Sequence, residues 1–328
     1  MRILITGGSG ALGKNIQEYV ENHFDDFEGK YPESKWFFVG RGKYINGKVG
    51  LRQGYEYDLT DIECAKDLIV DYNPDVILHL AAACGGIGLN KKVPAALGRD
   101  NLLMGINVLE AARMYNVPKV YLVGTVCSYG YETPTPFKED DFFNYGLSEP
   151  TNRCYSDAKK MIFSLHDAYR QQYGLKGAKL ILANLMGKHD NFDLESSHVI
   201  PALIRKFVEA KKENKPFVEC WGTGKAEREF LNFEDASRAL YLAIKNSLDS
   251  ELPINVGTGK SILIKDLAFL IGELVGYAGE IVFNGAVSDG QMKRRLDVSR
   301  AKEMFGFEAQ ISLRDGLRNT IEWYEGGI

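Results

Sequence analysis

The opening of the chain constrains its fold more than any other stretch. Met1–Thr6 is a short apolar run rich in Ile and Leu, which fits a buried parallel strand. Glycines follow at once in the spacing G-x-x-G-x-x-G, and a helical pattern then runs from Lys14 to Phe24. Because glycine lets the backbone turn tightly beside a phosphate, and a helix N-terminus attracts anions, this order predicts a dinucleotide pyrophosphate site. The alternative is a plain glycine-rich turn. The predicted contacts are Gly7, Gly10, Ala11, Leu12 and Gly13.

The end of the next expected strand, Trp36–Val39, bears on the choice of cofactor. A site selective for NAD usually ends this strand with Asp or Glu, which binds the ribose 2′-hydroxyl. Here Gly40, Arg41, Gly42 and Lys43 follow, so a carboxylate is absent and cations are present. The sequence therefore favours NADPH over NADH, with Arg41 near the 2′-phosphate, unless Arg41 and Lys43 simply lie in a solvated loop.

Short apolar strands alternate with helical patterns as far as about Asn184. This alternation predicts an α/β fold with a doubly wound parallel sheet of the Rossmann type, whose ligand crevice lies at the carboxyl ends of the strands. The expected strands include Pro74–Ala82, Val120–Val123 and Leu180–Asn184, and one expected helix is Pro94–Tyr115. Asp58 could accept a hydrogen bond from the adenine amino group. The cofactor contacts predicted at these strand ends are Asp58, Leu59, Leu80, Ala81 and Ala82.

Beyond Asn184 the regular alternation fades, which indicates a second and smaller α/β region. A strand, a turn and a strand are expected over Val218–Phe230, and a helix over Phe233–Asn246 that returns to the first region. We expect residues 1–183, with about 230–257, to form the NADP-binding domain. Residues 184–229 and 258–328 are then expected to form the substrate-binding domain.

A Tyr-x-x-x-Lys pair lies at the start of a helix expected to run to about Tyr173. Tyr155 and Lys159 share one helix face because positions i and i+4 lie one turn apart. A nearby ammonium stabilises a phenolate, so we expect the pKa of Tyr155 to fall, which would suit proton transfer to a carbonyl oxygen. Thr125 follows the fifth expected strand and lies at the same edge of the sheet. The alternative is a surface Tyr and Lys on an amphipathic helix.

Composition narrows the class of protein and of partner. The net charge is −4 without a long basic run, so nucleic acid is not expected as a partner. The five cysteines and five histidines follow no metal-type spacing, and we expect reduced thiols and no metal. With no signal peptide and no apolar run near twenty residues, the sequence predicts a soluble, cytoplasmic protein without membrane contact.

Taken together, the motifs resemble those of the extended short-chain dehydrogenase/reductases, and more narrowly the GDP-L-fucose synthase branch of that family. The similarity covers about His79 to Ala239 and, more loosely, both ends. The strings that carry it are His79-Leu-Ala-Ala82, Gly85-Gly-Ile87, Pro150-Thr-Asn-x-x-Tyr155, Asp190-Asn-Phe192, Ser197-His-Val-Ile-Pro-Ala-Leu203, Trp221-Gly-x-Gly224 and Arg228-Glu-Phe230.

The resemblance implies roles for five catalytic residues. Tyr155 would donate a proton to the C4 oxygen of a keto sugar, Lys159 would lower the pKa of Tyr155 and hold the nicotinamide ribose, and Thr125 would orient the carbonyl. Cys127 and His198 would be the epimerase pair that moves protons at C3 and C5. Taken alone, Cys127 could equally be a small buried hydrophobe, and His198 a helix-start histidine bonded to backbone.

The same resemblance implies a site for a GDP-linked 4-keto-6-deoxy sugar. Guanine would pack on Trp221, and Arg228 and Arg294 would contact the diphosphate. Departures from the branch pattern, such as Thr125 in place of Ser and Lys206 in place of Arg, leave the sugar open between a hexose and a heptose. The substrate residues are Gly86, Asn184, Lys206, Trp221, Arg228 and Arg294.

Other readings remain open at the level of the sequence. The chain could reduce its sugar after a separate epimerase has acted, or retain NAD as a nucleotide-sugar 4-epimerase or dehydratase. It could also be a non-catalytic protein that binds NADPH. Family members usually pair through two long helices, so the resemblance further implies a homodimer through a four-helix bundle formed by about Pro94–Tyr115 and Tyr155–Tyr173.

Overall fold

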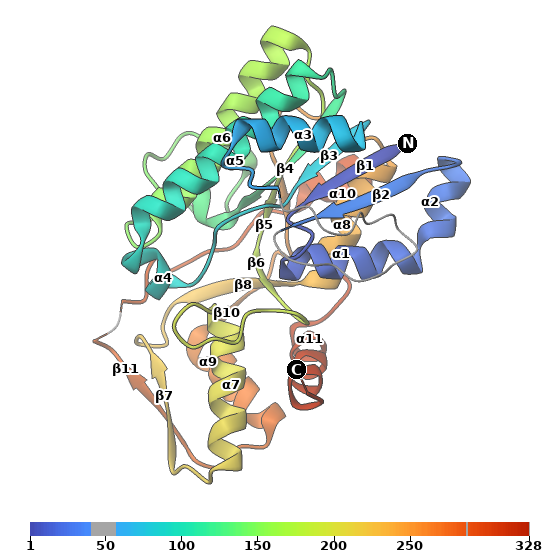
Figure 1. The fold of residues 1–328 in the computed structure, drawn as a ribbon. Helices are drawn as coiled ribbons and strands as arrows, with labels where there is room; N and C mark the ends of the chain where they lie inside the picture. Colours follow the sequence, from blue (N-terminus) through green and yellow to red (C-terminus); the bar gives the residue numbers. More distant parts are fainter. Residues whose placement is uncertain (41–56, 287, 328) are drawn as a thin grey trace.

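The larger sheet confirms the expected doubly wound α/β fold. The computed structural model describes residues 1–40, 57–286 and 288–327. The strand order is β2-β1-β3-β4-β5-β9, and all the pairings are parallel (Figure 1). The order reverses between β1 and β3, and a ligand crevice is expected there. The strands are β1 (Arg2–Thr6), β2 (Lys35–Val39), β3 (Val76–His79), β4 (Lys119–Thr125), β5 (Lys179–Leu182) and β9 (Ile254–Val256).

Helices cover both faces of this sheet. Figure 1 shows α3, α5 and α6 on one side and α1 and α8 on the other. The helix expected over Phe233–Asn246 forms as α8 and packs against α1, so it returns to the first region as expected. The sequence reading did not anticipate α2. The helices are α1 (Ala11–Asn22), α2 (Phe24–Lys30), α3 (Ile62–Tyr72), α4 (Ile87–Lys92), α5 (Pro94–Met114), α6 (Arg153–Tyr173), α8 (Phe233–Lys245) and α10 (Ser299–Phe305).

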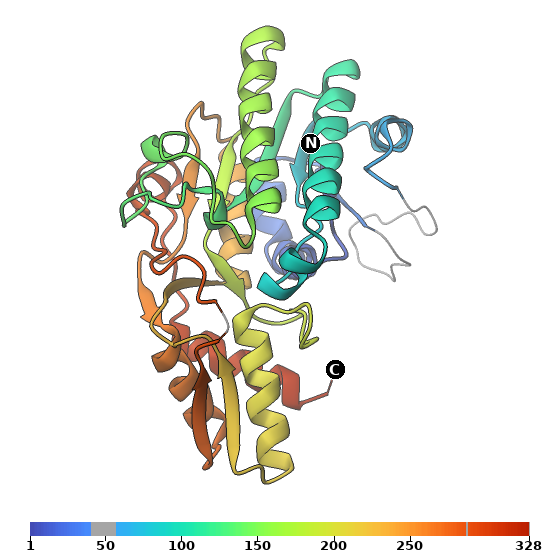
Figure 2. The same cartoon turned by 90° about the vertical axis from the view of Figure 1, so that its left-hand side faces the viewer.

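In the second region, the residues that the structure describes form two small sheets and three helices. One sheet has the order β10-β8-β6, and the other pairs β11 with β7 in parallel. Figure 2 shows this region below the larger sheet, with the yellow helix α7 beside the β7–β11 pair. The elements are β6 (Asn184–Met186), β7 (Phe217–Trp221), β8 (Glu227–Asn232), β10 (Ser261–Leu263), β11 (Glu280–Asn284), α7 (Val199–Lys212), α9 (Ile264–Val275) and α11 (Leu313–Glu325).

One expectation about the strands is corrected by the structure, and one is confirmed. The expected strand Leu180–Asn184 is two strands, because β5 ends at Leu182 and β6 begins at Asn184 in a different sheet. The strands expected on either side of a turn, β7 and β8, both form, but they do not pair with each other. The partner of β7 is β11, which lies far along the chain and which the sequence reading missed.

The described residues form two hydrophobic cores. The larger core lies on the parallel sheet and contains strand residues such as Ile3 and Ile5, while the smaller core lies among α7, α9 and β8. The larger core also includes Leu296 and residues of α10. The exact division of the chain into two domains stays a prediction.

Candidate active site

A cleft of about 730 Å³ lies at the carboxyl ends of the parallel strands and reaches residues of both cores. Every predicted site residue that the structure describes lines this cleft, whereas Arg41 lies outside the described residues. The lining residues that were predicted are Gly7, Gly10, Ala11, Leu12, Gly13, Asp58, Leu59, Leu80, Ala81, Ala82, Gly86, Thr125, Cys127, Tyr155, Lys159, Asn184, His198, Lys206, Trp221, Arg228 and Arg294.

The glycine loop fits a dinucleotide pyrophosphate. Helix α1 begins at Ala11, and its N-cap residue Gly10 supplies no side-chain hydrogen bond, so the first N–H groups of the helix are available to an anion. A Cβ added at Gly13 would lie 2.6 Å from Gly8 Cα, and it would also collide with the Gly7 carbonyl oxygen. Only glycine therefore allows this close backbone approach, which forms the cradle that the motif predicted.

Asp58, which was predicted to contact the adenine, lines the cleft. Its Oδ1 accepts hydrogen bonds from the backbone N–H of Thr60 at 3.0 Å and from Thr60 Oγ1 at 2.7 Å. Asp61 caps α3 by accepting from the Glu63 N–H at 2.9 Å, as expected of a residue at this point. The local bonds fix the Asp58 carboxylate at the edge of the cleft.

The Tyr155–Lys159 pair lies near the start of α6, and the Lys159 side chain is buried. Burial raises the pKa of Tyr155 well above its ordinary value, with Cys84 and Cys127 as further causes. Burial lowers the pKa of Lys159 to about 8. The expected lowering of the Tyr155 pKa is therefore wrong for the chain alone, because burial removes water from the phenol and so disfavours its charged form. Tyr155 thus stays protonated and can donate its proton.

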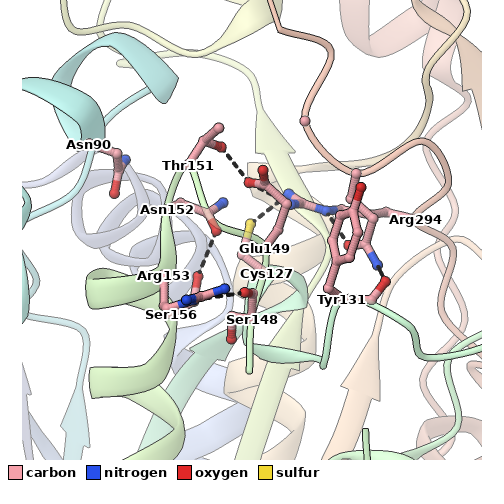
Figure 3. Close-up of polar contacts among 12 residues, drawn as sticks. Asn90, Cys127, Tyr131, Ser148, Glu149, Thr151, Asn152, Arg153, Ser156 and Arg294 are labelled. Carbon is pink, nitrogen blue, oxygen red and sulfur yellow. Dashed lines mark hydrogen bonds and ion pairs between the residues drawn. The ribbon is translucent and has the colours of Figure 1, made fainter. Parts of the chain in front are cut away.

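Thr125 and Cys127 are placed by the end of β4. Thr125 is the last residue of that strand, and its Oγ1 accepts a hydrogen bond from the Cys127 N–H at 3.3 Å. The short 3-10 helix η1 (Val126–Ser128) follows and turns Cys127 into the cleft. Its sulfur accepts a hydrogen bond from Arg294 Nη1 at 2.9 Å (Figure 3). Cys127 is therefore in a polar setting, unlike a cysteine that only fills an apolar core.

His198 enters the cleft from the second region, where it is the N-cap residue of α7 but makes no side-chain hydrogen bond to that helix. The ring is accessible from the cleft, yet the surrounding protein replaces much of its water and lowers its pKa. The preceding loop is tied to the end of β3, because the Gly86 N–H donates to the Ser196 carbonyl at 2.9 Å. The Gly86 N–H therefore already has a hydrogen-bond partner in the protein. The same bond holds the loop before His198 close to the ends of the parallel strands.

The predicted nucleotide residues form the outer part of the cleft. Trp221 is 51% exposed, and Lys206 Nζ lies 5.4 Å from its ring centre while donating to the Glu219 carbonyl at 2.9 Å. Asn184 donates to the Glu229 carbonyl at 2.8 Å and so ties β6 to β8. An exposed indole face beside a cation is suited to stacking a nucleotide base.

Arg228 is buried beside this outer part. Its guanidinium donates to the carbonyls of Glu227 and Asp289, each at 2.8 Å, and burial followed by the charge of Arg294 lowers its pKa to about 10. The neighbouring Glu229 does not pair with it. That carboxylate accepts from the backbone N–H groups of Thr258, Gly259 and Leu296, so it holds two loops against β8.

Several cleft residues were missed when the sequence was read for function. Cys84 follows the third alanine at the end of β3, and its pKa is raised chiefly by burial. Asp190 belongs to the Asp-Asn-Phe string that carried the resemblance, but no role was given to it. Asp289 opens a basic loop, Asp289–Asp297, and accepts hydrogen bonds from Thr223 N at 2.8 Å and Thr223 Oγ1 at 2.6 Å. The position of Cys84 after a strand and that of Asp190 within a motif are features of the sequence that could have identified both as cleft residues.

Neither a metal centre nor a membrane segment is evident in the part of the chain that the structure describes. No group of three or more His, Cys, Asp or Glu side chains there is placed to hold a metal ion. Over the same residues, none of the helices combines the length and apolar character that crossing a membrane requires.

Comparison with known proteins supports the resemblance. The chain is 34% identical to the GDP-L-fucose synthase of Escherichia coli (strain K12) over 98% of this chain and 96% of that protein. A crystal structure of a GDP-6-OMe-4-keto-L-xylo-heptose reductase from C. jejuni superposes with a TM-score of 0.85 at 27% identity, covering 99% of this chain and 97% of that one. A structure of a GDP-mannoheptose C4 reductase from Campylobacter jejuni with NADP bound gives a TM-score of 0.81 at 27% identity. The match covers 99% of this chain and 98% of that one.

A model of the NAD dependent epimerase/dehydratase family matches residues 3–257, which include the glycine loop, Thr125 and the Tyr155–Lys159 pair. This match extends over most of the chain and agrees with the doubly wound sheet and with the full-length relatives. The chain therefore belongs to the NAD dependent epimerase/dehydratase family.

Proposed function

We propose that the protein is an NADPH-dependent 4-reductase of a GDP-linked 4-keto-6-deoxy sugar. The observation that carries the proposal is one cleft that joins a glycine loop, Thr125, Tyr155 and Lys159 to an exposed Trp221. The similar proteins support the substrate class, since they are named as a GDP-L-fucose synthase and as reductases of GDP-linked heptoses. One of those reductases was solved with NADP bound, which supports the cofactor.

The reduction needs a proton donor beside the carbonyl, and the chain supplies one. NADPH, when bound on the glycine loop, supplies the hydride that reaches C4 of the sugar. Tyr155, kept protonated by burial, donates its proton to the C4 oxygen, and the hydroxyl of Thr125 orients that oxygen by a hydrogen bond. The Lys159 ammonium stabilises the phenolate that remains and binds the nicotinamide ribose.

The epimerase activity is a separate part of the proposal. A 4-keto group acidifies the hydrogens at C3 and C5, so one base and one acid can invert both carbons. Cys127 and His198 enter the cleft from β4 and α7 and fit those two roles. If they no longer act, the protein is a reductase that follows a separate epimerase.

The outer cleft is proposed to bind GDP. Guanine stacks on Trp221 beside the Lys206 cation, while Arg228 offers its remaining donors to the diphosphate, and Asn184 and Gly86 lie along the path to the sugar. NADPH is preferred over NADH because neither Val39 nor Gly40 at the end of β2 offers a carboxylate to the ribose. Arg41, proposed for the 2′-phosphate, lies outside the described residues.

We further propose a homodimer and a cytoplasmic location. Helices α5 and α6 lie side by side and extend beyond the sheet (Figure 2). Their outer surface exposes large apolar side chains, with Ile106, Met161 and Tyr173 among them. Such a surface on two long helices suits a four-helix bundle with a second copy. The division into an NADP-binding and a substrate-binding domain, with the cleft between them, is part of the same proposal.

The test is to mix the protein with NADPH and enzymatically made GDP-4-keto-6-deoxymannose, and to follow the absorbance of reduced nicotinamide. We expect oxidation of NADPH, with GDP-fucose as the product if Cys127 and His198 epimerise. The heptose analogue is the next substrate if the hexose is not reduced.

Tyr155→Phe should lower the rate of reduction by roughly 100-fold or more while NADPH still binds, because only the proton donor is lost. Tyr173→Phe, on the same helix but 48% exposed, is the matched control and should keep wild-type turnover. Unchanged turnover in Tyr155→Phe would contradict the assignment.

A further inference from the structure

Arg294 is a buried cation whose guanidinium lies against a thiol. Its side chain is 5% exposed, and Nη1 donates to Cys127 Sγ at 2.9 Å. Figure 3 shows the side chain reaching from the basic loop toward Cys127 and Glu149. Because burying a charge is costly unless its partners are fixed, this contact needs a supporting structure around it.

That support is present on the other donors of the guanidinium. Arg294 Nε donates to Gln291 Oε1 at 2.9 Å, and Gln291 Nε2 donates to the Tyr131 carbonyl at 2.7 Å. Nη2 lies 3.9 Å from Glu149 Oε2, a buried carboxylate that also accepts from Thr151 Oγ1. The guanidinium is therefore held in one orientation, with one arm on the sulfur.

Charged and titratable groups from several elements face Cys127. Arg294 contacts it directly, and Arg228 interacts with it from β8. Tyr155, on α6, also interacts with it and is a neutral phenol in the chain alone. Glu149 lies behind Arg294, and both Glu149 and Asp289 interact with Arg228, so the direct contact with the sulfur is the one that Arg294 makes. A thiolate next to Arg is the reactive form of cysteine as a base or nucleophile.

We propose, on the basis of the epimerase activity proposed above, that Arg294 is a positioning residue that holds Cys127 as a thiolate aimed at the sugar. This role differs from the phosphate contact expected from the sequence. The thiolate takes a proton from the carbon beside the keto group, forming S–H. The electron pair of the broken C–H bond passes to the C4 oxygen as an enolate. The protonated imidazole of His198 donates a proton to the opposite face of that carbon as the enolate returns to the ketone. Solvent then takes the proton from the Cys127 sulfur and returns one to His198.

The test measures how alkylation of Cys127 by iodoacetamide depends on pH in the full-length protein, with the modified peptide quantified by mass spectrometry. Arg294→Met should lower the alkylation rate near neutral pH by about tenfold, which equals a shift of about one pH unit in the midpoint. Arg294→Lys keeps a cation, so its alkylation rate near neutral pH should lie between those of the wild type and Arg294→Met. Arg295→Met removes the adjacent, exposed arginine and should match the wild-type profile.

Solvent deuterium incorporation at C3 and C5 of the substrate, followed in the same variants, should fall in parallel with alkylation. An unmoved alkylation profile in both Arg294 variants, with weaker binding of GDP, would overturn the proposal and return Arg294 to the diphosphate. If the wild-type chain incorporates no deuterium, the epimerase activity itself fails, and the proposed role of Arg294 fails with it. Wild-type incorporation that Arg294→Met leaves intact would overturn only the role of Arg294.

Discussion

At the scale of single residues, Asp190 is a cleft residue whose carboxyl pKa is changed by burial. Its Oδ1 accepts from the Asn191 N–H at 2.8 Å, whereas Oδ2 is buried and has no hydrogen-bond partner among the described residues. Burial raises the pKa of this carboxyl to about 7. A carboxyl that is neutral over part of the physiological range can donate to a ligand oxygen as well as accept from a hydroxyl.

The raised pKa makes stability depend on pH in a defined direction. Between about pH 4 and 7 the folded chain keeps the Asp190 proton after the unfolded chain has lost it, so the free energy of unfolding falls as pH rises. The Asn side chain in Asp190→Asn cannot ionise, so the variant avoids this loss. Relative to the wild type, its free energy of unfolding should be higher near pH 8 than near pH 5 by roughly 2–4 kcal/mol. Urea denaturation of the ligand-free chain at both pH values measures this difference.

Asp193→Asn, in the same loop, is the control. Hydrogen bonds from Ser196 lower the pKa of Asp193, so it is ionised at both pH values and the effect of its substitution should be the same at each. An equal effect of Asp190→Asn near pH 5 and pH 8 would show that Asp190 is already ionised throughout.

At the scale of elements, the turn from β1 into α1 is the part that we propose holds the cofactor phosphates. Gly13→Ala places a Cβ against Gly7 and Gly8, so the loop must shift away from the anion position. We expect NADPH affinity to fall by at least tenfold, and the chain to lose stability on the order of 1–3 kcal/mol from overpacking. Titration of intrinsic fluorescence with NADPH and thermal unfolding measure the two effects.

Gly29→Ala tests whether the effect is specific to that loop. A Cβ at Gly29, in α2, would meet no atom within 4 Å, so Ala should leave NADPH affinity unchanged and raise stability by about 0.5–1 kcal/mol. Equal NADPH affinity in Gly13→Ala and Gly29→Ala would contradict the placement of the pyrophosphate.

The elements also show what the sequence could predict. Local patterns gave α5 and α6 to within about two residues at each end, because apolar spacing and glycine or proline signals are encoded near each element. The pairing of β7 with β11 depends on contacts between distant segments, which no local pattern records. The Arg294–Cys127 contact and the raised pKa of Tyr155 likewise depend on three-dimensional burial, and motif spacing does not encode burial.

At the scale of the whole molecule, the outer surface of α5 and α6 is the place where a second copy is expected. Apolar side chains recur every four residues along α6 at Met161, Leu165, Tyr169 and Tyr173. Tyr169 donates to Glu110 of α5 at 2.6 Å, so the two helices present one continuous surface. Burying such a surface against its symmetry mate stabilises a dimer by the hydrophobic effect.

Met161→Glu should therefore convert a dimer into monomers of 36.7 kDa, because a charge would be buried at the centre of the interface. Phe269→Glu on α9 is the control, since Met161 and Phe269 are both 55% exposed but lie in different regions. Sedimentation velocity distinguishes the two states. A monomeric wild type, or a dimer that survives Met161→Glu, would contradict the interface.

The central claim is that hydride moves from NADPH to C4 of a GDP-linked keto sugar in this cleft. The most direct measurement uses NADPH that carries deuterium at the reactive C4 position of the nicotinamide, with GDP-4-keto-6-deoxymannose and its heptose analogue as substrates. Our account predicts one deuterium at C4 of the product sugar for each NADPH oxidised, and loss of that transfer in Tyr155→Phe. A product formed without deuterium, by a chain that retains NAD through turnover, would contradict the reductase and indicate an epimerase or dehydratase.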